Sequence, residues 1–328
     1  MMLRFEKVIG HEQVIEHLQN AIRLEKVSHA YLFSGEDGSG KKLLAHTFAS
    51  ALLCEERGTE PCGTCKACIQ AQTGNHPDII FVKHEKATIG VEDIRVQVNQ
   101  DIGIKPYSGR YKVYIIEDAE KMTDAAQNAL LKTIEEPPAY AVILLLATKP
   151  EALLATILSR CISLPLRPVD SEKIKRLLME SYQIPDYIAE LASTFSGGVV
   201  GRAIRFASSE DFTVQKEEVL HLMRAIDELS QEEIFEAVKL FAGKKERAEE
   251  CLDFMLLWYR DVLLFKATKD PNRMIYKSEV PQIQKQANLR SFENLAEIIE
   301  AIELFKQRIR ANVNFDIAME LLLLTIKG

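Results

Sequence analysis

The sequence of 328 residues has no long hydrophobic run and no excess of positive charge. Its longest apolar stretch, Ala141–Ala147, is far shorter than the roughly 20 residues that a membrane-spanning helix needs. The N-terminal residues contain no apolar segment of the kind that directs export, so we expect a cytoplasmic location. The formal net charge of −7 argues against a protein that grips DNA by itself.

Internal repeats and low-complexity segments are also absent from the sequence. The length is too great for one ordinary hydrophobic core and indicates two or three domains. Hydrophobic residues make up 47% and charged residues 27%, a balance that places the chain among globular proteins.

The first half of the chain alternates short apolar segments with amphipathic ones. Strands that are apolar throughout, with helices between them, predict a parallel sheet covered on both faces. The expected strands span residues 30–34, 78–82, 112–116 and 142–147, and the expected helices 11–23, 41–53, 91–101 and 123–136. After Pro168 the apolar spacing indicates helices alone. We therefore expect an α/β domain at 1–166, a small helical domain at 167–208 and a helical bundle at 209–328.

A glycine-rich segment, Gly35-Glu-Asp-Gly38-Ser-Gly40-Lys41-Lys42, lies between the first expected strand and the next helix. This is the position of a P-loop, whose backbone N–H groups and lysine bind phosphate oxygens. A plain strand-to-helix turn with a surface lysine pair is the alternative. Lys42 stands where a P-loop has Ser or Thr as a Mg²⁺ ligand, and an ammonium group has no lone pair to offer a cation.

Two acidic residues, Glu117 and Asp118, follow the third expected strand, where an ATPase carries an Asp that holds Mg²⁺ and then a Glu that orients the attacking water. Here their order is reversed, which moves each carboxylate by one methylene group. Catalysis tolerates such displacements poorly. A solvated acidic strand end is the alternative interpretation.

Four of the six cysteines, Cys54, Cys62, Cys65 and Cys68, fall within one short segment. Two consecutive C-x₂-C steps closed by an earlier cysteine suit a four-thiolate structural Zn²⁺ site. Iron–sulfur ligation, or free or paired cysteines, are the alternatives. We therefore expect Zn²⁺ as a structural cofactor in a module at about residues 54–68.

Two further segments resemble the AAA+ subunits of the bacterial DNA polymerase III clamp loader. They are Asn128-Ala-Leu-Leu-Lys-Thr-Ile-Glu-Glu-Pro-Pro138 and Ala147-Thr-Lys-Pro150 followed by Thr156-Ile-Leu-Ser-Arg160-Cys161. The resemblance covers about residues 1–205. It implies an AAA+ (P-loop NTPase-like) α/β domain, a helical lid and a C-terminal collar domain that assembles with other subunits.

The resemblance also implies roles for individual residues. Thr148 matches the sensor-1 position, and Arg160 matches an arginine finger that reaches the γ-phosphate held by a neighbouring subunit. A local salt bridge is the alternative role for Arg160. Gly201 occupies the position of the sensor-2 arginine, and Arg202, one residue later, would face about 100° away on a helix.

Three positions that serve hydrolysis are thus altered, at Lys42, at the Glu117–Asp118 pair and at Gly201, whereas Arg160 is intact. The resemblance then implies a non-hydrolysing delta-prime type of subunit that acts in trans on a neighbour's ATP. Its implied partners are gamma/tau ATPase subunits and a delta subunit, and through them the sliding clamp and primed DNA. An ATP-hydrolysing gamma/tau-like subunit and a zinc-finger nucleic-acid-binding protein are the rival hypotheses. Whether ATP binds the altered loop stays open.

Overall fold

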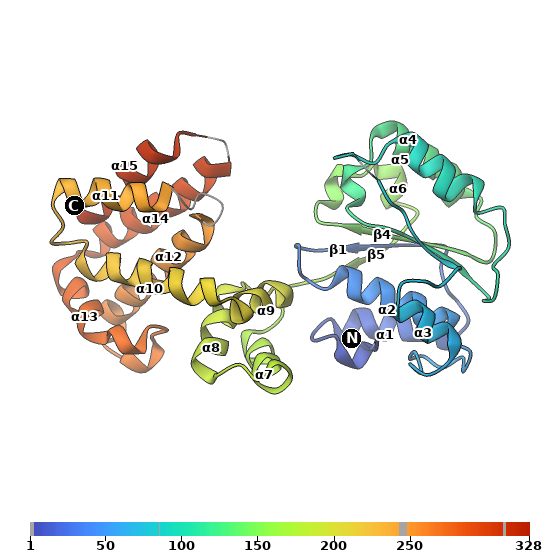
Figure 1. Cartoon of the computed structure of the whole chain (residues 1–328), viewed down its shortest axis with the longest axis horizontal. Helices are drawn as coiled ribbons and strands as arrows, with labels where there is room; N and C mark the ends of the chain where they lie inside the picture. Colours follow the sequence, from blue (N-terminus) through green and yellow to red (C-terminus); the bar gives the residue numbers. More distant parts are fainter. Residues whose placement is uncertain (1–2, 85, 243–247, 311–312) are drawn as a thin grey trace. The chain divides into compact units, whose positions relative to one another are not determined.

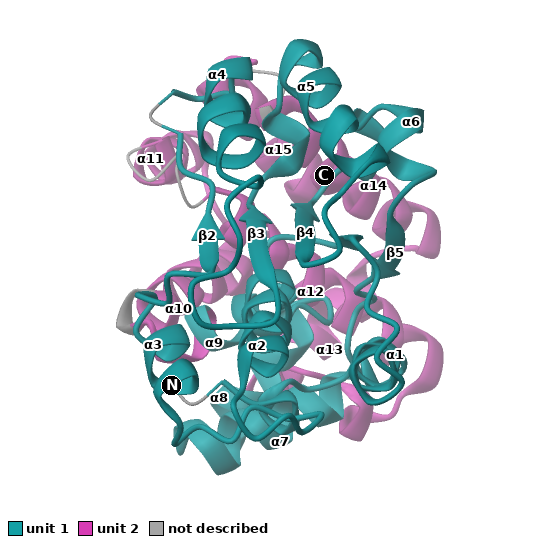
Figure 2. Ribbon diagram, turned by 90° about the vertical axis from the view of Figure 1, so that its right-hand side faces the viewer, with its two compact units in different colours: residues 1–205 teal, residues 206–328 magenta. Residues whose placement is uncertain are grey.

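The computed structural model describes residues 3–84, 86–242, 248–310 and 313–328. The chain falls into two compact units, Met1–Arg205 and Phe206–Gly328 (Figure 2). The boundary between these units lies close to the boundary expected near residue 209. A separate lid domain at 167–208 stays a prediction, because these residues belong to the first unit almost to their end.

Among the described residues, the first unit holds a sheet of five parallel strands in the order β2-β3-β4-β1-β5. The strands are β1 (Ala30–Ser34), β2 (Ile79–Phe81), β3 (Lys112–Ile116), β4 (Ala141–Ala147) and β5 (Ile162–Pro165). The inner strands β1, β3 and β4 are buried along their whole length, as continuous apolar runs require. The predicted parallel α/β sheet is confirmed.

The edge strand β5 corrects the sequence prediction, which expected four strands. It pairs in parallel with β1, and only Leu164 of its four residues is buried. An edge strand that is half exposed leaves no continuous apolar run, so the pattern in the sequence does not reveal it. The strand places the chain after Arg160 beside β1, whose end leads into the glycine-rich loop.

Helices cover both faces of this sheet (Figure 1). One face carries α1 (Glu12–Arg23), α2 (Lys41–Leu53) and α3 (Lys66–Gln72), and the other carries α4 (Val91–Ile94), α5 (Asp124–Glu135) and α6 (Ala155–Leu158). Successive residues of β1 serve the two cores in turn: Phe33 packs with Phe48 of α2, and Leu32 packs in the core that holds Leu130 of α5. The helix expected at 91–101 is α-helical only in α4 and continues as a π-helical segment, Arg95–Gln100.

The remainder of the first unit is helical. The helices are α7 (Ser171–Tyr182), α8 (Asp186–Phe195) and α9 (Val200–Ser208), whose last residues extend beyond the unit boundary. Asp170 begins α7, since its side chain accepts hydrogen bonds from the backbone N–H groups of Glu172 and Lys173. The start of α9 lies near the glycine-rich loop, as the contacts below show.

The second unit consists of helices throughout the part that the structure describes. They are α10 (Glu210–Ala225), α11 (Gln231–Ala242), α12 (Ala248–Thr268), α13 (Val280–Leu289), α14 (Phe292–Arg310) and α15 (Phe315–Lys327). Trp258 is fully buried at its centre, and its indole N–H donates to Gln286 Oε1 at 2.8 Å. The Gln286 amide donates in turn to the Met223 carbonyl, which ties α13 to α12 and α10. None of the described helices has the length and apolar character to cross a bilayer.

Candidate functional site

The glycine-rich loop leaves β1 and enters α2, at the place predicted for a phosphate-binding loop. Gly38 and Gly40 have φ angles of 84° and 102°, which side chains with a Cβ avoid. The N-terminus of α2 begins at Lys41, directly after the loop. The loop, the start of α2 and the end of β3 enclose a cavity of about 460 Å³. Its lining includes Gly38, Gly40, Lys41, Lys42, His46 and Glu117.

Lys41 points back into the loop that precedes it. Its ammonium group donates to the Gly35 and Glu36 carbonyls at 2.6 and 2.9 Å and to Thr148 Oγ1 at 3.3 Å. Burial lowers the pKa of Lys41, and the nearby carboxylates of Asp37 and Glu120 oppose this effect. The predicted loop lysine and sensor-1 threonine are therefore in direct contact.

Lys42 forms an ion pair with Glu117. Its ammonium nitrogen lies 2.8 Å from Glu117 Oε1 and 3.1 Å from Oε2, so both carboxylate oxygens face one cation. The side chains are 64% and 38% exposed, respectively, and water therefore reaches the pair. Asp118 does not join this contact, because it adopts a left-handed backbone conformation and pairs with Lys121 at 2.8 Å.

Glu120 is a site residue that the sequence prediction missed. Its Oε1 accepts a hydrogen bond from the Thr148 backbone N–H at 3.0 Å. Its Oε2 is buried and has no hydrogen-bond partner among the described residues. The available signal was a third acid, two residues after Asp118, but no motif rule assigns it a partner directly after β4.

The start of α9 packs directly against the glycine-rich loop. The Gly201 backbone N–H donates to the Gly38 carbonyl at 2.9 Å. Arg202 pairs with Glu36 at 3.0 Å and Arg205 lies 3.8 Å from Asp37, so two cations of α9 contact acids of the loop. Arg202 thus reaches the loop, although its place one residue after the sensor-2 position suggested that it faces away.

A side chain at position 201 would collide with the loop. A β-carbon there would lie 2.8 Å from the Gly38 carbonyl oxygen and 2.9 Å from its Cα. We expect Gly201→Ala to lower the free energy of unfolding of the first unit by about 1–3 kcal/mol, because overpacking exceeds the gain of up to about 1 kcal/mol from replacing a helical glycine. Chemical denaturation measures this difference.

The matched control is Gly103→Ala. A β-carbon at Gly103 meets nothing within 4 Å, and its φ is not positive. This variant should unfold within about 0.5 kcal/mol of the wild type. Equal stabilities of the two variants would contradict close packing of α9 on the loop.

Arg160 lies two residues after the end of α6, a helix on the opposite face of the sheet from α2. Its Nη2 contacts Glu135 Oε1 at 2.9 Å, and its Nη1 donates to the Thr156 carbonyl at 3.0 Å and to Ser159 Oγ at 3.4 Å. The Arg160 side chain is 39% exposed. The local salt bridge expected under the alternative interpretation is therefore present, and part of the Arg160 side chain remains open to solvent.

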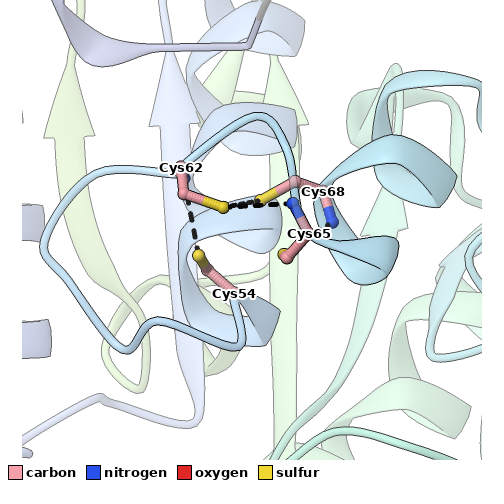
Figure 3. A group of neighbouring side chains, drawn as sticks. All are labelled: Cys54, Cys62, Cys65 and Cys68. Carbon is pink, nitrogen blue, oxygen red and sulfur yellow. Dashed lines mark hydrogen bonds between the residues drawn. The ribbon is translucent and has the colours of Figure 1, made fainter.

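The four cysteines of the predicted metal site come together (Figure 3). Their sulfur atoms all lie within 4.8 Å of one another, and Cys62 Sγ is 3.9 Å from Cys68 Sγ. The backbone N–H groups of Cys65 and Cys68 donate to Cys62 Sγ and Cys65 Sγ, the pattern of a tight metal knuckle. Cys54 is the first residue after α2 and Cys68 belongs to α3, so two helices of the first unit carry this cluster.

The local environment shifts the pKa values of these thiols in opposite directions. Hydrogen bonds from the backbone N–H groups of Cys65 and Thr64 lower the pKa of Cys62 to about 6. Burial raises the pKa of Cys54 and raises that of Cys68 to about 12. A bound cation stabilises the thiolate form of a buried cysteine, because it neutralises the negative charge. The donor set and its spacing fit a bound metal ion.

Two family models match the chain. The model described as "DNA polymerase III, delta subunit" matches residues 10–170, and "DNA polymerase III, delta subunit, C terminal" matches residues 214–328. The DNA polymerase III subunit delta' of Bacillus subtilis (strain 168) is 30% identical over 96% of this chain and 95% of its own length. The chain belongs to the DNA polymerase III delta' family.

Subunits named tau are similar over less of their length. The tau subunit of Bacillus subtilis (strain 168) is 30% identical over 92% of this chain but only 56% of its own length. The tau subunit of Escherichia coli (strain K12) is 40% identical over 53% of this chain and 27% of its own length. Because the delta' match accounts for nearly all of both chains, it supports the delta' interpretation over the gamma/tau-like one.

The structure brings the predicted residues of this delta' chain together in three places. The phosphate loop gathers Gly35, Gly38, Gly40, Lys41, Lys42, Glu117 and Thr148. The cysteines form a second cluster, and Arg160 stands apart from both with Glu135 as its partner. Asp118 lines the cavity but turns its carboxylate to Lys121.

Proposed function

We propose that this delta' chain completes the ATPase site of a neighbouring clamp-loader subunit and does not hydrolyse ATP itself. Its partners would be gamma/tau ATPase subunits and a delta subunit, and the assembled loader would act on the sliding clamp and primed DNA. Replication takes place where the chromosome lies, so the chain would work in the cytoplasm. The observation that carries the proposal is the ion pair between Lys42 and Glu117.

This ion pair joins two positions that an active ATPase uses to hold Mg²⁺. The P-loop hydroxyl and the strand-end carboxylate normally share one divalent cation. Here the Lys42 ammonium contacts both Glu117 oxygens directly. A second cation beside this ammonium would meet like-charge repulsion and would lack the hydroxyl ligand. The pair therefore supports a loop that works without Mg²⁺, or does not bind nucleotide at all.

Two further contacts support the absence of turnover. Asp118, which would stand in for the water-orienting Glu, is paired with Lys121. Position 201 leaves no room for a sensor-2 side chain, because a β-carbon there would lie 2.8 Å from the Gly38 carbonyl oxygen. Restoring one of these positions would not restore the others, so a single substitution is not expected to produce an active enzyme.

Arg160 supports the part of the proposal that concerns the neighbour. An arginine keeps its charge under all physiological conditions and binds phosphate oxygens through a rigid fork of N–H groups. Its side chain is more than one-third exposed and pairs with Glu135 of α5, and it is not among the residues that line the cavity at this chain's own glycine-rich loop. Such a group can act on a phosphate bound by another subunit.

For the cysteine cluster we propose a structural Zn²⁺ ion. A tetrahedral site with Zn–S bonds of about 2.3 Å places its sulfur atoms about 3.8 Å apart. The 3.9 Å separation of Cys62 and Cys68 agrees with this value. Four thiolates leave no open coordination position, so the metal would hold the segment between α2 and α3 and take no part in the chemistry.

Calorimetry with a non-hydrolysable ATP analogue tests the nucleotide side of the proposal. We expect Mg²⁺ to raise the affinity of the chain for the ATP analogue by less than about twofold, because the Lys42–Glu117 pair leaves no place for the cation. The purified chain should also show no ATP hydrolysis above background. Binding without metal and no binding both agree with this expectation.

The control for this experiment is Lys42→Thr, which frees Glu117 and supplies a hydroxyl ligand. In this variant Mg²⁺ should raise any affinity for the analogue. A wild-type chain whose affinity rises tenfold with Mg²⁺, or whose ATP hydrolysis disappears in Lys41→Ala, would contradict the proposal.

A further inference from the structure

We propose that Glu135 is a positioning residue for Arg160, which holds the guanidinium group so that its remaining N–H groups face a phosphate on the adjoining subunit. This inference rests on the proposed role of Arg160 in trans. It adds a residue from a different helix to the group that would act on the neighbour's ATP.

The contacts of Arg160 come from two places in the fold. Glu135 is the last residue of α5, and its Oε1 lies 2.9 Å from Nη2 of Arg160. The Thr156 carbonyl and Ser159 Oγ, at 3.0 and 3.4 Å from Nη1, belong to α6 and the residue after it. The guanidinium group is therefore held between α5 and the turn after α6. These contacts limit rotation about the side-chain bonds of Arg160.

These contacts use only part of the guanidinium group. Arginine has five N–H donors. Nη1 donates hydrogen bonds to Thr156 and Ser159, and Nη2 forms the ion pair with Glu135. The Nε–H has no hydrogen-bond partner among the described residues. Nε and Nη2 lie on one edge of the planar group, the fork that binds two oxygens of a phosphate or carboxylate, and the Glu135 contact leaves the Nε–H of this fork free.

An unanchored arginine would serve this task poorly. Its side chain has four rotatable bonds, and ordering them at the moment of reaction opposes catalysis. An ion pair formed before the subunits meet removes much of this freedom, and the accuracy of placement decides the rate. Glu135 is 48% exposed, so water weakens the pair and lets Arg160 adjust when a phosphate arrives.

The same contact could instead restrain Arg160 and keep it from the neighbour. The two roles predict opposite results. If Glu135 positions the finger, loss of its charge slows hydrolysis at the adjoining site. If it restrains the finger, the same change accelerates hydrolysis. The free Nε–H and the exposure of the Arg160 side chain favour the positioning role, because Glu135 contacts only one nitrogen of the fork.

The test uses a clamp loader reconstituted with gamma/tau and delta subunits, sliding clamp and primed DNA. Rapid-quench measurements follow hydrolysis in the first turnover. With Glu135→Gln we expect the rate of first-turnover ATP hydrolysis at the site next to this chain to fall about tenfold. The KM for ATP should change little. Glu135→Asp, whose carboxylate is one methylene shorter, should lie between this variant and the wild type. In Arg160→Ala the adjoining site's share should disappear from the fast phase, and adding Glu135→Gln should change nothing further.

The matched control is Glu136→Gln, which changes the next residue of the chain, an exposed acid that forms no ion pair with any residue the structure describes. It should match the wild type. If Arg160→Ala slows the loader but Glu135→Gln leaves it unchanged or faster, the positioning role of Glu135 is wrong and the role of Arg160 stands. If Glu135→Gln slows the loader equally with and without Arg160, Glu135 acts through folding or assembly. If Arg160→Ala has no effect, both proposals fail together.

Discussion

Replacing Arg160 by Ala should abolish fast ATP hydrolysis at one site of the reconstituted clamp loader and slow clamp loading with it. Arginine fingers contribute about 10³- to 10⁵-fold to the rate in other NTPases, because the guanidinium group stabilises charge that develops on the transferred phosphoryl group. Only the site that adjoins this chain should be affected. Rapid-quench hydrolysis and a clamp-loading assay on primed DNA measure the two effects.

Folding should not account for this loss. The ion pair of Arg160 with Glu135 joins side chains that are 39% and 48% exposed, and exposed pairs contribute about 1 kcal/mol or less to stability. Arg160→Lys keeps the positive charge but lacks the fork, so it should recover only a small part of the rate.

The control for the charge itself is Arg110→Ala. Arg110 is also an exposed arginine in an ion pair, with Glu25 at 3.1 Å, but it lies at no predicted site. Its loss should leave hydrolysis and clamp loading unchanged. If Arg160→Ala behaves like Arg110→Ala, the salt bridge with Glu135 is the whole role of Arg160 and the proposed function is wrong.

Removal of the metal should have the second large effect, on stability. The native chain should contain about one zinc ion, as four-cysteine sites do. Cys68→Ser should release it and lower the unfolding temperature of the first unit by on the order of 10 °C, which corresponds to several kcal/mol for a unit of this size. The cost arises because the buried sulfur of Cys68 belongs to α3, which packs on α2, the helix that follows the phosphate loop.

Metal analysis together with a thermal melt checks this prediction. The control is Cys161→Ser, a half-buried cysteine outside the cluster, which should retain the metal. A native protein with well under one zinc ion per chain, or a Cys68→Ser variant that keeps both its metal and its melting temperature, would exclude the structural Zn²⁺ site.

The candidate sites differ in how completely their residues could be predicted from the local sequence. The four cysteines lie within one short segment, so their spacing alone was enough to predict that they meet. The glycine-rich loop could be predicted equally well, because glycines at positive φ and a lysine at the start of a helix are local features. Glu120 was missed, since its contact with Thr148 joins the ends of two strands that are separated in the chain.

Arg160, the proposed arginine finger, also depends on a contact between residues that are distant in the sequence. The sequence indicated Arg160 through the segment around it, but it did not indicate Glu135 as its partner. Glu135 lies at the end of α5 and Arg160 after α6, and the two come together because both helices pack on the same face of the sheet. The sequence therefore left the arginine finger and the local salt bridge as separate alternatives for Arg160. Only the fold shows that one salt bridge, with Glu135, could serve the finger.

The sequence by itself determined the parallel α/β class, the glycine-rich loop between β1 and α2 and the cysteine cluster, because apolar runs, glycine spacing and cysteine spacing act over a few residues. The tertiary structure alone decided the strand order, the edge strand β5, the pairing of Lys42 with Glu117, 75 residues apart, and the packing of Gly201 on Gly38. Contacts of this kind depend on how buried surfaces fit across the sheet and between helices, and no local pattern encodes that fit.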